Sequence, residues 1–290
     1  MISSAENIQQ DSGFWGQAWH RFRYEKAGTA GACLILLLTL ISFGSDFISQ
    51  YDPIAHGDLL LDRFIAPGWD HLFGTDKFGR DIFSRVLYGG RISLTIGVSV
   101  VLLSGIIGLL YGTLSGYAGG RIDSVMMRIL DFLLAFPMIF LLIMIITLFK
   151  VNHWYLIPVL GLTGWMETAR LVRAEVLSIK TQEYILAAKG FGYSHLRIIF
   201  HHIIPNCVHI VFVSAPLKAA EVILLESALS FLGIGVQPPT PSWGSIINDG
   251  REALISAWWV AAFPGIFITI TVLSFHLAAE GLKKSINPGK

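Results

Sequence analysis

Ionisable side chains inside one long apolar stretch are the residues of this sequence with the clearest chemical meaning. Lys218, Glu221 and Glu226 lie between residues 207 and 233, where most other side chains are apolar. If that stretch crosses a membrane, an unpaired charge in it costs about 3 kcal/mol, so these side chains should face protein, water or each other. Lys218 and Glu221 are three positions apart and can pair on one helical face. Two roles stay open for this candidate polar site: an internal ion pair that fixes helix packing, or part of a substrate path.

The sequence lacks the residue patterns of common catalytic and metal sites. The Gly-x-x-x-x-Gly-Lys-Ser/Thr loop that holds ATP phosphates is absent, and so is the Gly-x-Ser-x-Gly setting of a nucleophilic serine. His201 and His202 are adjacent rather than one helical turn apart, which is poor spacing for a metal site. Cys33 and Cys207 lie in or beside apolar segments, where a thiol usually acts as a small apolar group. We therefore expect no catalytic residue, no metal ligand and no cofactor in this chain.

The composition indicates that these residues belong to a membrane protein. Hydrophobic residues make up 53% and charged residues 14% of the chain, and the mean hydropathy is +0.62. Soluble domains usually contain about 25% charged residues. The net charge is +1, and the basic residues do not form the stripe that a nucleic-acid backbone would require. The chain is therefore predicted to be an integral membrane protein that binds no nucleic acid.

A membrane-spanning helix needs about 20 mostly apolar residues, and the sequence offers six such stretches. We predict an all-α polytopic membrane protein with spans near residues 27–47, 92–117, 127–149, 153–174, 207–233 and 257–280. The first span follows Arg21, Arg23 and Lys26 and has no small-residue cleavage site, so we expect a retained anchor rather than a signal peptide.

Small residues along the second span predict how it packs. They recur at every fourth position, at Ser104, Gly108, Gly112 and Gly116. A row of small side chains on one helical face lets a neighbouring backbone approach closely. Close helix packing is the expected role, with a sliding or hinge face as the alternative.

The distribution of Lys and Arg predicts which helix ends lie in the cytoplasm. With residue 1 inside, thirteen basic residues fall on the cytoplasmic side and seven on the outer side, as the positive-inside rule requires. Both termini are then cytoplasmic. The predicted division is a cytoplasmic segment 1–26, a first span with its outer loop 27–91, a five-helix core 92–282 and a cytoplasmic tail 283–290.

A polar, patterned segment interrupts the core at residues 183–206, on the cytoplasmic side of this topology. Residues 183–189 are good helix formers, and Gly190 and Gly192 end that helix. Ser194 can cap a second helix from about residue 195 to 203, and Pro205 stands where the next span should begin. An amphipathic helix on the lipid surface is the alternative. Because apolar residues are sparse between 183 and 195, contact with a soluble partner is favoured.

The spacing of this segment resembles a loop found in one family of transporters. The cytoplasmic EAA motif of ABC importer permeases, in the dipeptide, oligopeptide and nickel branch, is similar to Glu183-Tyr184, Ala187-Ala188 and Gly192, followed by Ile204-Pro205-Asn206. In other branches a Glu directly precedes the Ala pair, where this chain has Leu186. Further matches to the branch are Gly74-Thr75-Asp76, Gly79-Arg80-Asp81, Ser84-Arg85 and Gly90-Arg91, and then Glu226, Leu229-Ser230-Phe231-Leu232-Gly233, Pro238-Pro239 and Trp243-Gly244.

The resemblance implies the type I ABC importer permease fold, with the chain as the second, C-type permease of a heterodimer. It implies a coupling helix-turn-helix that docks on a cytoplasmic ATP-binding subunit, formed by Glu183, Tyr184, Ala187, Ala188, Gly192 and Pro205. It also implies contact with a solute-binding protein on the outer side through Asp76, Arg80, Asp81 and Trp243. Two ATP-binding subunits would hold ATP and Mg²⁺, and the assembly would lie in a bacterial cytoplasmic (inner) membrane.

We therefore interpret the chain as half of the translocation path of an ATP-driven importer, with ATP hydrolysis in partner subunits. Di- or oligopeptides are the expected cargo, because residues 119–128 look most like oligopeptide permeases. The same family importing nickel or metal chelates is the alternative. A secondary transporter, driven by an ion gradient through Lys218, Glu221 and Glu226, is a further alternative. The two halves of the sequence show no inverted repeat of the kind such transporters contain.

Overall fold

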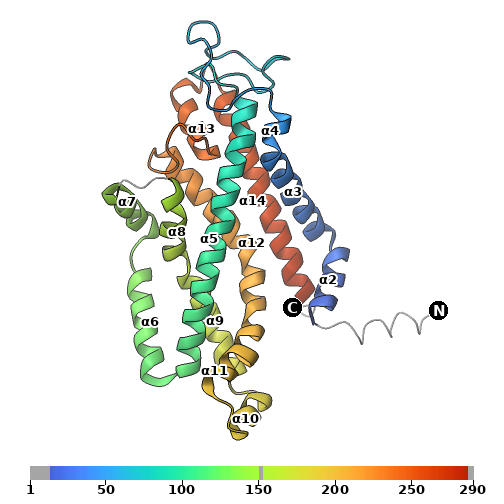
Figure 1. The fold of residues 1–290 in the computed structure, drawn as a ribbon, viewed down its shortest axis with the longest axis vertical. Coiled ribbons are helices and arrows are strands. Elements are labelled where there is room, and N and C mark those ends of the chain that lie inside the picture. The colour runs from blue at the N-terminus through green and yellow to red at the C-terminus, as the bar shows by residue number, and fades with distance from the viewer. Residues whose placement is uncertain (1–13, 150–152, 287–290) are drawn as a thin grey trace, which may run out of the picture.

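The computed structural model describes residues 14–149 and 153–286, and its regular elements are helices (Figure 1). In these ranges the strand-like pairing is limited to an isolated antiparallel bridge between Thr75 and Asp81. The all-α prediction is therefore confirmed. Residues 1–13 and 287–290, which belong to the predicted terminal segments 1–26 and 283–290, lie outside the described residues.

The helices differ widely in length, from single turns to α5, which has 37 residues. In chain order they are α2 Phe14–Tyr24, α3 Lys26–Phe43, α4 Ser45–Ile48, α5 Ile82–Ala118, α6 Gly120–Leu134, α7 Met138–Phe149, the 3-10 turn η1 His153–Tyr155, α8 Leu156–Gly164, α9 Met166–Ile179, α10 Glu183–Gly190, α11 His195–Ile198, the π-helical turn η2 Ile199–Ile203, α12 Ile204–Phe231, α13 Trp243–Gly250, the 3-10 turn η3 Arg251–Ala253 and α14 Trp259–Ile286.

Among the described residues, four helices are long and apolar enough to cross a membrane: α3, α5, the continuous helix His195–Phe231, and α14. They confirm the first, second, fifth and sixth predicted spans. The predicted third span, 127–149, is interrupted, because α6 and α7 meet at an angle of 79° and can count only as a bent pair. The predicted fourth span, 153–174, is divided among η1, α8 and α9. The count of six spans is therefore not confirmed.

Local chemistry explains both interruptions. Pro137 stands between α6 and α7, and it has no N–H with which to continue the helix. Gly164 ends α8, and Trp165 separates it from α9. Helix α9 then carries Glu167, Arg170 and Arg173, which make it too polar for a span of the kind we predicted. Apolar length alone does not detect such breaks.

The long helix α5 runs through the middle of the molecule and contacts α9, α12, α8 and α3 (Figure 1). Its row of small residues packs closely against a neighbouring helix, as predicted, and that helix is α9. A Cβ added to Gly108 would lie 2.7 Å from Cβ of Thr168, and one added to Gly112 would lie 2.8 Å from Cβ of Val172. These distances leave no room for a side chain, so the two backbones approach as closely as glycine allows.

A second close approach joins the first and last long helices, α3 and α14. A Cβ added to Gly28 of α3 would lie 2.7 Å from Cα of Gly281 in α14. Near the same place Lys284 of α14 pairs with Glu25, which links α2 to α3, at 3.1 Å. The described start and end of the chain are therefore fixed to each other.

The elongated molecule has two structurally different ends (Figure 1). The end formed by α10 and α11 is named the α10 end below. The opposite end, formed by residues 49–81 and α13, is named the α13 end. Helix α5 connects the two, and α2 and the last turns of α14 lie toward the α10 end.

Candidate functional site

Helix α10 buries one side and exposes the other. Ile185 and Ala188 are buried in an apolar cluster with residues of α9, α11, η2 and α12. Glu183, Tyr184 and Ala187 are exposed. The predicted Ala187–Ala188 pair is therefore divided: Ala187 faces outward, whereas Ala188 contacts its own chain.

Exposed apolar side chains gather on this segment. Leu186, Phe191 and Leu196 are 54%, 81% and 68% exposed. Tyr184 is 46% exposed, and desolvation by its surroundings raises the pKa of its phenol above the usual value. A short segment with several exposed apolar residues and an acidic start is typical of an interaction site.

The turn after α10 is built on Gly192, which has φ +76°. Its N–H donates to the carbonyl of Lys189 at 3.0 Å, and the N–H of Tyr193 donates to the carbonyl of Ala188 at 3.1 Å. This pair of bonds is the Schellman arrangement that ends helices on a left-handed glycine. Ser194 then caps α11 by accepting from the N–H of Arg197, as the sequence predicted. The turn therefore holds α10 and α11 at a defined angle.

Helix α10 is connected mechanically to several long helices. Ile185 and Ala188 share their cluster with Val172 and Val176 of α9 and with Cys207 of α12. The lower end of α5 is also attached, because Tyr117 Oη lies 2.7 Å from Nδ1 of His195, and Nζ of Lys180 donates to the carbonyl of Gly116 at 2.8 Å. Helix α10 therefore packs directly on α9 and α12, whereas α5 is joined to the neighbouring α11 and to the end of α9.

The second predicted helix, residues 195–203, is the beginning of the long helix that contains α12 rather than a separate element. The π-helical turn η2 lies at its junction and ends at Ile203, two residues before Pro205. Proline cannot donate the next helical hydrogen bond, and a π-turn shifts the bonding pattern by one residue at that point. Pro205 is thus inside a continuous helix, which the sequence reading did not foresee.

The three ionisable residues of the predicted polar site belong to two separate clusters, which corrects the prediction that grouped them. Lys218 pairs with Glu221 of the same helix at 2.9 Å and with Glu167 of α9 at 3.2 Å. These groups border a cavity of about 270 Å³ next to the bend between α6 and α7. The expected Lys218–Glu221 pair is confirmed, and Glu167 is a partner that sequence spacing could not reveal.

Glu226 is fully buried and is surrounded by serine hydroxyls. Ser230 donates to its Oε1 at 2.7 Å, and Ser93 of α5 donates to its Oε2 at 3.0 Å. Ser230 in turn accepts from the N–H of Val236, and Ser93 accepts from the N–H of Trp243 at 3.4 Å. Glu226 therefore ties α12 and α5 to the segment that leads into α13, by hydrogen bonds rather than by an ion pair.

The residues predicted to contact a solute-binding protein are buried. Asp76, Arg80, Asp81 and Trp243 are at most 5% exposed. Nε1 of Trp243 donates to the carbonyl of Val86 at 2.9 Å, and Nε of Arg80 donates to Asp76 at 2.7 Å. Direct contact by these side chains is thus not available in this structure. They instead support the surface of the α13 end from beneath.

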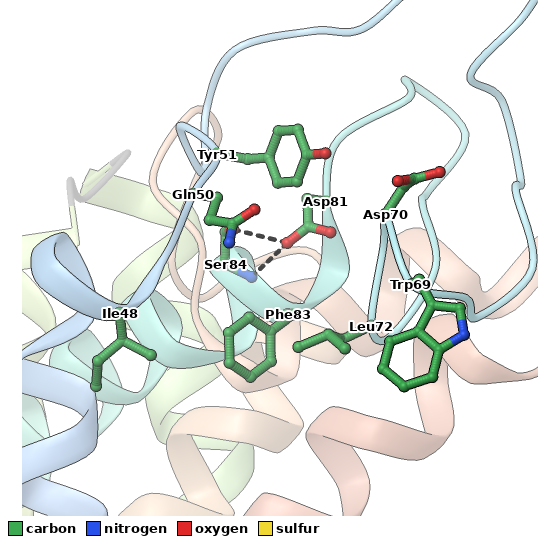
Figure 2. A pocket seen from close by; sticks show the side chains of 9 residues that line it. All are labelled: Ile48, Gln50, Tyr51, Trp69, Asp70, Leu72, Asp81, Phe83 and Ser84. Carbon is green, nitrogen blue, oxygen red and sulfur yellow. Dashed lines mark hydrogen bonds between the residues drawn. The ribbon is translucent and has the colours of Figure 1, made fainter.

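Asp81 borders a cavity of about 150 Å³ at the α13 end, shown in Figure 2. Its carboxylate accepts from the N–H of Ser84 at 2.8 Å and from its hydroxyl at 2.6 Å, and it lies 2.9 Å from Nδ1 of His71. Figure 2 places Tyr51 and Gln50 on one side of Asp81, and Trp69 and Leu72 on the other. Asp81 therefore acts as the N-cap of α5.

Several functional candidates were missed by reading the sequence. Asp249 of α13 accepts from both Arg80 and Arg85, more than 160 residues away along the chain. Arg173 donates to Asp123 through Nε and Nη2, each at 2.6 Å, and fixes α9 to α6. Asp131 pairs with Arg170 rather than with Arg128, its neighbour one turn away. The sequence showed only that these residues are charged. It could not show the partner of each one, because that partner lies on a different segment of the chain.

Comparison with known proteins gives two matches that together cover most of the chain. Residues 108–290 match the family described as binding-protein-dependent transport system inner membrane component. Residues 13–67 match the N-terminal TM domain of oligopeptide transport permease C.

Individual proteins are similar over nearly the whole length. The dipeptide transport system permease protein DppC of Bacillus subtilis is 39% identical over 286 residues, which cover 98% of this chain and 89% of that protein. The oligopeptide transport system permease protein OppC of the same organism is 39% identical over 285 residues, covering 98% and 93%. OppC of Escherichia coli (strain K12) is 39% identical over 276 residues, covering 94% and 91%.

Proposed function

This chain belongs to the family of binding-protein-dependent transport system inner membrane components, and we propose that it is one permease subunit of an ATP-driven importer of di- or oligopeptides. Its long apolar helices would form half of the translocation path. The observation that carries the mechanical part of the proposal is α10, which exposes Glu183, Tyr184, Leu186 and Ala187 while its buried side is packed on α9 and α12.

In this proposal α10 docks on a cytoplasmic ATP-binding subunit. Leu186 stands where other branches of the family have Glu, and its side chain would enter an apolar part of the partner's groove. Glu183, at the first turn of α10, would meet a basic group. The turn at Gly192 and the contacts of Ile185 would transmit movement of the partner to the long helices, so nucleotide binding would bias the transporter between two states.

The remaining partners are proposed from the family description and from the names of the relatives. The family name specifies a binding protein, and the relatives are parts of dipeptide or oligopeptide transport systems. We therefore expect a second, homologous permease subunit, two ATP-binding subunits that hold ATP and Mg²⁺, and a solute-binding protein at the α13 end. The α10 end would face the cytoplasm of a bacterial cell, with both termini on that side. The chain itself would hydrolyse no ATP.

Peptides are the proposed cargo because the relatives named above are permeases of dipeptide and oligopeptide transport systems. Nickel or metal chelates remain the alternative within the same family. An ion-gradient mechanism through Lys218, Glu221 and Glu226 receives less support, since Glu226 takes its hydrogen bonds from serines and belongs to a different cluster from Lys218.

Copurification with an ATP-binding subunit tests the proposal directly. Leu186→Lys, at the exposed side of α10, should abolish copurification and peptide uptake by proteoliposomes, because a positive charge does not fit an apolar part of the partner's groove. Leu254→Lys is the matched control for copurification, because Leu254 is 52% exposed, close to the 54% of Leu186, but lies near α13 at the other end. Peptide uptake by liposomes that contain this chain without any ATP-binding subunit would overturn the proposal.

A further inference from the structure

A cluster of charged side chains at the α13 end holds more positive than negative charge. Arg80 and Arg85 both donate to the same atom, Oδ2 of Asp249, each at 2.9 Å. Arg80 also pairs with Asp76 at 2.7 Å, and Lys77 lies 3.6 Å from Oδ1 of Asp249. Three cations in this cluster therefore share the carboxylates of Asp76 and Asp249.

Arg85 is incompletely paired within the cluster. Its side chain is 2% exposed, yet its Nε and Nη1 have no hydrogen-bond partner among the described residues. The carboxylate of Asp76 is 3.7 Å from Nε, which is beyond hydrogen-bond range. Buried donors of a charged group are costly when no acceptor meets them. One more anion at this site would therefore balance the excess positive charge and accept from the unpaired donors of Arg85.

A cavity of about 200 Å³ lies against Arg85. It is bounded by the start of α5, the segment between α12 and α13, and α13 itself. Helix α13 lies near the top of Figure 1. Polar side chains form much of its wall, including those of Arg80, Arg85, Thr240 and Asn248, and the carboxylate of Asp249 lines it as well. Since one water occupies about 30 Å³ of liquid, the cavity has room for a small anionic group together with a few of its neighbouring atoms.

We propose that this cavity binds a carboxylate through Arg85, and that the carboxylate is the C-terminal group of the peptide cargo. The identity of the cargo rests on the proposed function. Every linear peptide carries one C-terminal carboxylate whatever its sequence, so a site for this group accepts many peptides with one set of contacts. An acidic side chain of a partner protein offers the same chemistry, and the experiment must separate the two sources.

The experiment measures binding of trialanine and of trialanine amide to the full chain in lipid nanodiscs by calorimetry. The amide lacks only the negative charge at the C-terminus. We expect trialanine to bind at least about tenfold more tightly than the amide, the ratio for one charge-assisted hydrogen bond. Arg85→Gln should remove this preference. Arg251→Gln, an exposed arginine that does not border the cavity, should leave it unchanged.

A second variant covers the case in which Arg85→Gln does not fold. Thr240→Glu adds a carboxylate at the wall of the cavity while Arg85 stays in place, and it should weaken trialanine binding by a similar factor. Equal affinity for trialanine and its amide in the wild-type chain would overturn the proposal. So would unchanged binding in a folded Arg85→Gln chain or in Thr240→Glu.

Two further measurements identify the source of the carboxylate and separate this proposal from the proposed function. If trialanine does not bind, while Arg85→Gln weakens docking of the solute-binding protein to the nanodiscs, the carboxylate belongs to that partner and the cargo assignment is overturned. Uptake of labelled trialanine by the complete transporter tests the proposed function independently. If the transporter takes up trialanine but the chain binds trialanine and its amide equally well, only the carboxylate site is refuted.

Discussion

Replacing Gly192 by alanine tests whether the turn after α10 requires a left-handed residue. Gly192 has φ +76°, and a Cβ added there would meet nothing within 4 Å. The cost of Gly192→Ala is therefore purely conformational, and it amounts to about 1 to 2 kcal/mol for an L-residue held in the left-handed region. Gly190 provides the matched control, because a Cβ there also meets nothing within 4 Å but its φ is not positive. Gly190→Ala should be neutral or slightly stabilising, since alanine favours a helix.

The magnitude can be read from amide hydrogen exchange. A cost of about 1 to 2 kcal/mol raises the population of the open turn about 5-fold to 30-fold. In the closed turn, Gly192 and Tyr193 donate to Lys189 and Ala188, so the exchange rates of these two N–H groups report the opening. Mass spectrometry of exchange over residues 183–198 in the full chain makes the measurement. Gly192→Asn should restore slow exchange in part, because asparagine tolerates the left-handed region better than alanine.

The same variants connect the turn to function. In the complete transporter, Gly192→Ala should lower cargo-stimulated ATPase activity, whereas the amount of chain in the membrane should not change. Equal exchange rates in Gly190→Ala and Gly192→Ala would refute the conformational argument. Faster exchange in Gly192→Ala with normal ATPase activity would refute the coupling role of the turn.

Two further predictions concern stability. Gly112→Ala should lower the stability of the purified chain by about 1 to 3 kcal/mol through overpacking against α9, measured by thermal unfolding in detergent. Gly265→Ala is its control: Gly265 lies inside α14 and a Cβ there would meet nothing within 4 Å, so unfolding should stay unchanged or shift slightly upward because alanine favours a helix. Glu226→Leu should cost about 1 to 3 kcal/mol, because the buried hydroxyls of Ser93 and Ser230 lose their acceptor. Glu226→Gln keeps an acceptor of the same shape and should cost less in the same assay. Equal losses would argue against a stabilising role of the hydrogen bonds from Ser93 and Ser230.

Patterns carried by neighbouring residues predicted much of the fold. Apolar length located four of the long helices, and four-residue spacing identified the packing face at Gly112. The end of α10 at Gly192 and the cap of α11 at Ser194 were also predictable, because both depend on the conformational preferences of single residues. These features have in common that the physical cause lies within one or two helical turns.

Features that depend on distant partners were not predictable in the same way. The sequence placed Glu226 with Lys218, but Ser93 on another helix supplies one of the bonds of Glu226, and Glu167 on α9 supplies the second partner of Lys218. Arg80 was expected at a protein surface, whereas Asp249 and Asp76 hold it inside the α13 end. A charged residue in a sequence shows that a partner is needed, but only the fold shows which partner it is.

The contact between Gly28 and Gly281 has a consequence for how the chain is made. The two residues come from opposite ends of the sequence, and the contact between α3 and α14 requires both backbones. At synthesis rates of about 5 to 20 residues per second, α3 leaves the ribosome at least on the order of ten seconds before α14 does. During that interval the glycine face of α3 has no helix of its own chain to cover it. We expect lipid or the insertion machinery to shield this face. A ribosome stalled before α14 should therefore yield a chain whose helix α3 crosslinks to the insertase.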